Sequence, residues 1–374
     1  MRVLMLHNRY RAEGGEERAV ANILTLLARR GHTVEVLERS SMGVPRRRAA
    51  QGLLVGGLHP DEVAAAVRRA RADVVHGHNL HPLLGWRALA AARAAGARTV
   101  LHLHNFRLFC AIAVAYRDGA PCFRCRGSNT LPGLRLRCRG SLGEAAAYAA
   151  GLHRQQPHLY ANADQFIVLS KASGARMHEL GLPSGRTHVL GNFVPGPGFA
   201  TGTRAHQGTY ALALGRLVEE KGFEIAIAAA RAASVPLVVA GAGPDDQRLR
   251  RLAAGAEVRF TGWVDHARLA ELRAGAAVVL VPSRCEEACP YAALDSLAAG
   301  VPVLVSDRGG IPERVPGYSV LTTDDRHAWT NALAELWRDP DLRRARGEEA
   351  LALAHELLSE ERYYEGLMAV YGAA

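Results

Sequence analysis

Short apolar, β-branched runs alternate along the chain with longer stretches of helical periodicity. In the first half, helices are expected over 16–30, 60–71 and 82–95, and the apolar runs around them read RVLMLH, TVEVLE, DVVHGH, TVLHLH and QFIVLS. In the second half a helix is expected from about residue 221, and the runs read YALALGRL, PLVVAG, EVRFTG, AVVLVPS and PVLVSD. Such alternation is typical of βαβ units, in which helices cover both faces of a parallel sheet. We therefore predict an α/β fold.

A break in this pattern divides the chain. Residues 193–208, FVPGPGFATGTRAHQG, are rich in Pro and Gly and have no periodicity, which is typical of a linker. The alternation restarts after it, so we predict two doubly wound, Rossmann-like domains whose strand ends face a central cleft. Residues 141–163 are expected to form a long helix, and the tail another, with Ser359 as its N-cap.

Composition limits the class of protein. The chain has 374 residues, of which 49% are hydrophobic and 22% charged, as in globular proteins. It contains no uncharged apolar run of membrane-spanning length, and MRVLMLHNRY lacks the apolar core of a secretory signal, so we expect a cytoplasmic protein. The net charge of +10 suggests an anionic partner: nucleic acid, an anionic lipid surface or a phosphorylated ligand. Arg far exceeds Lys and Ala is abundant, so GC-rich coding, as in high-GC bacteria, is an alternative source of part of this charge.

Two strand ends carry candidate phosphate-binding residues. Gly14 and Gly15 precede the first helix, where backbone N–H groups can approach a phosphate; a plain tight turn is the alternative, and the pattern is not the dinucleotide fingerprint GxGxxG. Arg216 and Lys221, in GRLVEEKG, end a strand and begin a helix. Two cations there can stabilise a departing phosphate, unless both are merely solvated.

Four cysteines form a candidate zinc site. Their spacing, C-x11-C-x2-C-x12-C, could supply four thiolates to a structural Zn²⁺, which in a cytosolic protein is expected more than two disulfides; free thiols are the alternative (Cys110, Cys122, Cys125 and Cys138). The same segment, about 106–140, is rich in Arg, including Arg107. It is either an insertion that meets an anionic or membrane-bound acceptor, or an ordinary solvated loop.

Histidines end two neighbouring strands, as His76 and His78 in VHGHN and as His102 and His104 in LHLHN. We expect at most one of each pair to point into the site. A histidine zinc site is disfavoured, because no carboxylate partner is evident.

The segment VPSRCEEACPYAALDSLAAGVPVLVSDRGGIPE, with GRLVEEKG, VVAGAGPDDQRL and FTGWV, resembles the retaining GT-B glycosyltransferases of family 4. Those enzymes have an acid, seven residues and a second acid before an AxGxPV run. Glu287 matches the first acid, and Asp295 replaces the usual Glu at the second. In the first half GGEE, DVVHGHN, TVLHLHN and HVLGNFV match the same family.

The resemblance implies a GT-B fold and a role for each domain. Residues 1–195 would bind the acceptor, 209–355 would bind the nucleotide sugar, and the helix in 356–374 would pack back on the first domain. It also implies roles for single residues. Glu287 would hold sugar hydroxyls and Asp295 the ribose. Arg216 and Lys221, assisted by the N–H groups near Gly14 and Gly15, would stabilise the diphosphate, and His104 would support the sugar centre. Further donor-side residues are Cys289, Pro290 and Tyr291; acceptor-side candidates are His78, Asn105 and Arg107.

The implied activity is retaining, metal-independent transfer of a sugar from a nucleoside diphosphate donor to a hydroxyl acceptor: a glycolipid, a polysaccharide or a natural product. No cofactor is then required for catalysis, and a structural Zn²⁺ is the one metal considered. The expected location is cytoplasmic with peripheral contact to an anionic membrane, and no nucleic acid partner is expected. Two alternatives stay open, a nucleotide-sugar epimerase of GT-B fold and an inactive sugar-nucleotide-binding protein.

Overall fold

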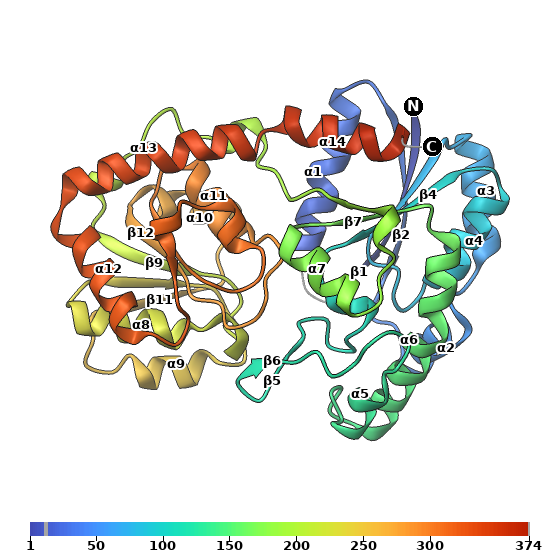
Figure 1. Cartoon of the computed structure of the whole chain (residues 1–374), viewed down its shortest axis with the longest axis horizontal. Helices are drawn as coiled ribbons and strands as arrows, with labels where there is room; N and C mark the ends of the chain where they lie inside the picture. The colour runs from blue at the N-terminus through green and yellow to red at the C-terminus, as the bar shows by residue number, and fades with distance from the viewer. Residues whose placement is uncertain (11–13, 373–374) are drawn as a thin grey trace. The chain divides into compact units, whose positions relative to one another are not determined.

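The computed structural model describes residues 1–10 and 14–372, which form two compact units (Figure 1). The first unit contains Met1–Ala115, Cys122–Gly191 and the chain from Tyr364 on. The second unit contains Tyr116–Pro121 and Asn192–Tyr363. Each unit has its own sheet and its own apolar core, so each is described separately.

The first unit is built on a six-stranded sheet of order β2-β1-β3-β4-β7-β8, in which every pairing is parallel. Its strands are β1 (Arg2–Arg9), β2 (Thr33–Ser40), β3 (Val74–Gly77), β4 (Arg98–Leu103), β7 (Gln165–Val168) and β8 (Thr187–Val189). Its helices are α1 (Gly15–Arg29), α2 (Arg46–Val55), α3 (Pro60–Ala70), α4 (Gly85–Ala94), α5 (Leu131–Arg135), α6 (Leu142–Asn162) and α7 (Lys171–Glu179). The last described helix is α14 (Glu360–Gly372), which belongs to this unit from Tyr364 on.

The second unit repeats this architecture with the strand order β11-β10-β9-β12-β13-β14, again entirely parallel. Its strands are β9 (Tyr210–Leu214), β10 (Leu237–Ala240), β11 (Val258–Gly262), β12 (Ala276–Val281), β13 (Val303–Ser306) and β14 (Val320–Leu321). Its helices are α8 (Phe223–Ala233), α9 (Asp246–Leu252), α10 (His266–Ala274), α11 (Tyr291–Ala298), α12 (Arg326–Arg338) and α13 (Pro340–Leu357). A short hairpin, β5 (Tyr116–Arg117) with β6 (Ala120–Pro121), also belongs to this unit.

Both strand orders belong to doubly wound sheets, which confirms the predicted fold class. In such sheets ligands bind beyond the carboxyl ends of the strands, at the point where the order reverses. That point lies between β1 and β3 in the first unit, and between β9 and β12 in the second. A ligand site is therefore expected at the carboxyl-end edge of each sheet, beside the reversal point.

Most predicted elements are present, and the differences lie in weak patterns. The helix expected at 82–95 begins at Gly85. The elements that had not been predicted are the helices α2, α5, α7, α12 and α13 and the short strands β5, β6, β8 and β14. The missed strands have only two or three residues each, too few for a periodic signal. Ser359 lies at the expected cap, where its Oγ accepts a hydrogen bond from the Arg362 N–H at 3.4 Å. No helix among residues 1–10 and 14–372 is long and apolar enough to cross a membrane.

Candidate functional site

A pocket lies at the reversal point of the first sheet, beyond the carboxyl ends of β1, β3 and β4. Six of the polar residues that line it follow these strands or begin α1: Tyr10, Glu16, His78, His104, Asn105 and Arg107. The structure thus brings together the four first-domain side chains that had been nominated for catalysis or acceptor binding, His78, His104, Asn105 and Arg107. Tyr10 and Glu16 join them without having been singled out.

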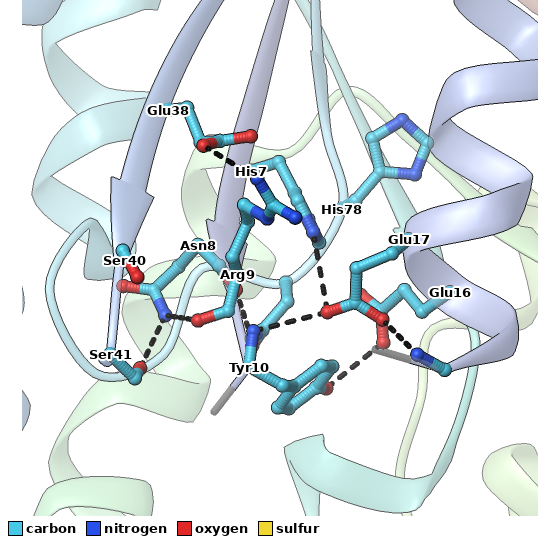
Figure 2. Close-up of polar contacts among 12 residues, drawn as sticks. His7, Asn8, Arg9, Tyr10, Glu16, Glu17, Glu38, Ser40, Ser41 and His78 are labelled. Atoms are coloured by element: carbon cyan, nitrogen blue, oxygen red, sulfur yellow. Dashed lines mark hydrogen bonds and ion pairs between the residues drawn. The ribbon is translucent and has the colours of Figure 1, made fainter. Parts of the chain in front are cut away.

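The Glu16 carboxylate accepts two side-chain hydrogen bonds in this pocket, and Figure 2 shows the one from Tyr10. It accepts the Tyr10 hydroxyl at 2.9 Å and the Asn105 Nδ2 group at 3.1 Å. Asn105 Oδ1 also accepts the Arg107 N–H at 2.9 Å, which fixes the loop after β4. Burial raises the pKa of Glu16 to about 7, although nearby His7 and the Tyr10 hydrogen bond oppose the rise. A carboxyl group that titrates near neutrality inside a pocket is typical of functional sites.

The turn before α1 is held by its own acidic side chain. The Glu17 carboxylate accepts the Gly14 N–H at 3.0 Å, which is the contact that an N3 acid makes in a capping box, and the Tyr10 N–H at 3.1 Å. Gly15 is the first residue of the helix. A phosphate bound by the backbone N–H groups of Gly14 and Gly15 would have to compete with this carboxylate, so their phosphate-binding role stays a prediction.

The strand-end histidines form one stack. His102 and His104 lie with ring centroids 4.1 Å apart, and His76 and His78 with centroids 4.3 Å apart. His78 Nδ1 lies 2.9 Å from His104 Nε2. The expectation that at most one of each pair points into the site was wrong for His102 and His104, which both line the pocket because residues two apart in a strand face the same side. Of the other pair, only His78 lines it. Burial lowers the pKa of both His76 and His104 to about 3, so these imidazoles are neutral.

In the second unit an ion pair lies at the equivalent reversal point. Lys221, in the loop after β9, donates to Glu287 Oε2 at 2.6 Å. The hydroxyl of Ser283, just after β12, donates to the other oxygen of Glu287. Burial alone would lower the pKa of Lys221, but the Glu287 carboxylate raises it, so the ammonium stays charged. A carboxylate accepts about four hydrogen bonds, so these two contacts leave capacity for hydroxyl groups of a ligand.

Two cations follow β9, but they have different partners. Arg216 is exposed and lies 3.4 Å from Glu220, whereas Lys221 contacts Glu287. Gly222 has a positive φ of 66°, and a side chain there would collide with the carbonyl of Pro282. The backbone approach of these two loops places Lys221 beside Glu287.

The second predicted acid lies inside α11. Asp295 is buried, and its carboxylate accepts Arg273 Nη2 at 3.3 Å. Pro290 and Tyr291 begin the same helix, and the carbonyl of Cys289 accepts the Asn192 side chain at 2.9 Å. The structure therefore shows a charged partner for Asp295 that the spacing did not indicate, while its ribose role stays a prediction.

All four cysteines of the candidate zinc site, Cys110, Cys122, Cys125 and Cys138, are free thiols that lie within the first unit. Burial raises the pKa of Cys125 to about 11, with smaller contributions from the other three. Across residues 1–10 and 14–372, the sole group of three metal-ligating side chains with ligand atoms within 4.8 Å of one another consists of histidines. Zinc binding by the cysteines stays a prediction.

Sequence reasoning missed three residues that shape these sites: Tyr10, Glu16 and Ser283. The motifs GGEE and PSRCEE contain Glu16 and Ser283. Their positions could have indicated these residues, since each motif follows a strand that borders the reversal point of its sheet. The environment of Glu16 depends on Asn105, 89 positions away, so the spacing could not reveal it.

The Glu16 carboxyl group predicts a pH-dependent stability. Its pKa of about 7 in the folded protein exceeds the ordinary 4.5, so the folded state binds more protons between these values. The stabilisation is complete below about pH 4.5 and is lost as the pH rises through about 7, by roughly 3 kcal/mol in total. The side chain of the Glu16→Gln variant stays neutral at every pH, so the variant does not lose this stabilisation. Between about pH 5 and pH 8.5, the free energy of unfolding of the variant minus that of the wild type should therefore increase by about 2–3 kcal/mol.

Urea unfolding at the two pH values measures this difference. Glu38→Gln, which changes a half-exposed carboxylate paired with Arg9, is the matched control and should show no such rise. An equal pH response in Glu16→Gln and wild type would contradict the assigned pKa.

Profiles of known families match both units. The family described as "Glycosyltransferase Family 4" matches residues 13–195, and "Glycosyl transferases group 1" matches residues 208–339. The chain is 30% identical over 410 residues to D-inositol 3-phosphate glycosyltransferase of Acidothermus cellulolyticus, covering 96% of this chain and 85% of that protein.

A second relative matches only in part. It is a GDP-mannose-dependent alpha-(1-6)-phosphatidylinositol dimannoside mannosyltransferase of Mycobacterium tuberculosis, 34% identical over 139 residues. That match covers 37% of this chain and spans about a third (35%) of the relative.

Among solved structures, the whole chain superposes on Anabaena HepE in complex with UDP, with a TM-score of 0.69 and 18% sequence identity over 100% of both chains. This likeness concerns the fold, and it agrees with the GT-B fold that the sequence had suggested. Together with the family profiles and the full-length relative, it establishes that the chain belongs to the group 1 glycosyltransferases, with a family 4 glycosyltransferase region in its first half.

Proposed function

We propose that this protein is a retaining glycosyltransferase that moves a sugar from a nucleoside diphosphate donor to a hydroxyl acceptor. The observation that carries the proposal is the Glu287 carboxylate, held by Lys221 and Ser283 at the reversal point of the second sheet. This carboxylate lies after β12, within the region that matches the group 1 glycosyltransferases.

Each donor-side residue has a proposed task. Glu287 accepts hydrogen bonds from vicinal sugar hydroxyls, for which a carboxylate with two oxygens is well suited. Lys221 orients Glu287 and, with Arg216, stabilises negative charge on the diphosphate leaving group. Asp295 holds the ribose, and Cys289, Pro290 and Tyr291 shape the entrance of α11.

The first unit is proposed to bind the acceptor and to support transfer. Neutral His104 contacts the transferred sugar, Asn105 and Arg107 bind the acceptor, and N–H groups near Gly14 and Gly15 assist the diphosphate. We nominate no side chain as a nucleophile; the leaving phosphate itself draws the acceptor proton, without a catalytic metal. Exclusion of water would prevent hydrolysis of the donor.

The relatives narrow the candidate substrates. One is named for GDP-mannose and a phosphatidylinositol dimannoside, another for D-inositol 3-phosphate, and HepE was solved with UDP. The donor panel should therefore include both UDP and GDP sugars. The acceptor panel should include polyols and glycolipids beside polysaccharides and natural products. A cytoplasmic, bacterial enzyme with peripheral contact to an anionic membrane fits a glycolipid acceptor.

The first test is the variant Glu287→Gln, which keeps the side-chain shape but removes the charged acceptor. Hydrogen bonds to charged groups contribute roughly 1.5–3 kcal/mol, so turnover should fall about 10- to 100-fold. Affinity for the nucleoside diphosphate alone should change little, because the sugar is absent. Thermal-shift screening of nucleotide sugars selects the donor, and product analysis with its acceptor measures turnover.

Glu271→Gln is the matched control, because Glu271 also pairs with a cation but lies exposed on α10. Unchanged turnover in Glu287→Gln would remove the proposed role of the carboxylate. Formation of an epimer from the donor alone would replace the proposal by the epimerase alternative. Donor binding without transfer to any acceptor would favour the inactive binding protein.

Asp295→Asn separates a structural role of this acid from ribose binding. Because the carboxylate pairs with Arg273 and both side chains are about nine-tenths buried, its neutralisation should cost roughly 3 kcal/mol of stability. At a temperature where the variant is folded, nucleotide affinity should also fall if Asp295 holds the ribose. Isothermal titration with the nucleoside diphosphate decides: lost stability with unchanged affinity would assign Asp295 to packing alone.

A further inference from the structure

Three buried histidines of the first unit lie on the same face of two adjacent strands. β3 and β4 pair in parallel with His76 opposite Val100, so positions 76, 78 and 102 share a face. The ring of His76 is nearly parallel to that of His102, with an interplanar angle of 6° and centroids 5.4 Å apart. His78 lies 5.3 Å from His102 by the same measure. The three imidazoles therefore lie against one another in one buried cluster.

The ring nitrogens converge there. One nitrogen from each of His76, His78 and His102 lies within 4.8 Å of the others, and the three residues are at most 3% exposed. Tetrahedral zinc with bonds of about 2.0–2.1 Å would place such nitrogens about 3.4 Å apart. The rings would need to approach by little more than an ångström, which lies within the reach of side-chain rotation.

The hydrogen bonds of the three rings have an arrangement typical of metal ligands. His76 Nδ1 lies 2.7 Å from the hydroxyl of Tyr371, and His78 Nδ1 lies 2.9 Å from His104 Nε2. In contrast, His76 Nε2, His78 Nε2 and both nitrogens of His102 have no hydrogen-bond partner in the part of the chain that the structure describes. A ligating histidine commonly gives one nitrogen to the metal and the other to an outer partner. Buried polar atoms without a partner require such an explanation.

We propose that His76, His78 and His102 bind one divalent transition-metal ion, for which Zn²⁺ is best suited. Neutral imidazole is a preferred ligand of zinc, and three histidines with one further ligand form known zinc sites without a carboxylate. The sequence argument against this site, that no acid accompanies the histidines, therefore does not hold. The pocket that is lined by His78 and His102 provides a path for the ion and for a water molecule as fourth ligand.

The ion would join three parts of the first unit. It would link β3 to β4 directly, and through His76 it would engage Tyr371 of α14. Through His78 it would set the orientation of His104, whose side chain lines the same pocket. Binding of the ion does not depend on the proposed transferase activity, whereas its effect on His104 bears on that activity, because His104 is proposed to contact the transferred sugar.

Cobalt titration tests the proposal on the full chain, without a polyhistidine tag and after chelator treatment. When Co²⁺ is the only metal added, one Co²⁺ per chain should bind to the histidines. Its absorption spectrum should show tetrahedral d–d bands and no thiolate charge-transfer band. That band identifies any ion held by the four cysteines, so the two sites are counted separately. His102→Gln should abolish binding of the Co²⁺ ion that shows no thiolate band. Tyr371→Phe removes an outer partner and should weaken it about 10- to 100-fold.

The control is His266→Gln, which changes an exposed histidine of the second unit. It should leave Co²⁺ binding unchanged, both with and without the thiolate band. If His102→Gln does not fold, X-ray absorption of the zinc-loaded wild type replaces it. A thiolate-free ion should then show nitrogen neighbours at about 2.0 Å with imidazole scattering. The proposal is overturned if every bound ion has sulfur ligands, if no ion binds, or if His102→Gln binds as well as the wild type.

Discussion

Strand polarity is the constraint on which both sites depend. Because every pairing within each six-stranded sheet is parallel, the loops that follow the strands meet at one edge of the sheet. In the first unit this edge gathers Tyr10 after β1, His78 after β3 and His104 after β4. In the second it gathers Lys221 after β9 and Ser283 after β12. Residues far apart in the sequence become neighbours for this reason alone.

Burial has a different effect on the charges of the site residues in the two units. In the second unit the charged groups are matched, since Glu287 has an ammonium and a hydroxyl on its two oxygens. Such a carboxylate is oriented before a ligand arrives, which is the condition for electrostatic preorganisation. In the first unit burial favours neutral forms, so Glu16 titrates near neutrality and the histidines stay uncharged. Uncharged imidazoles can accept a metal or a hydroxyl proton, whereas imidazolium can do neither.

The sequence could predict the alternation of strands and helices, and it could mark Glu287 and Asp295 as candidate acids, because both features are encoded in contiguous residues. It could not predict the pair between Lys221 and Glu287, which are 66 positions apart and meet only through the register of β9 with β12. Nor could it show that Asp295 contacts Arg273, or that Tyr10 and Asn105 share Glu16. The short strands β8 and β14 escaped because two or three residues show no period. The histidine stack could have been recognised, since positions two apart in a strand always face the same side.

The most direct test of the central claim is a crystal structure of the wild-type protein with the nucleoside diphosphate sugar that it binds most tightly. The account predicts two sugar hydroxyls within hydrogen-bond distance of the Glu287 carboxylate, with the diphosphate beside Lys221. A sugar bound at a different edge of the second sheet, with Glu287 still contacting only Lys221 and Ser283, would contradict it.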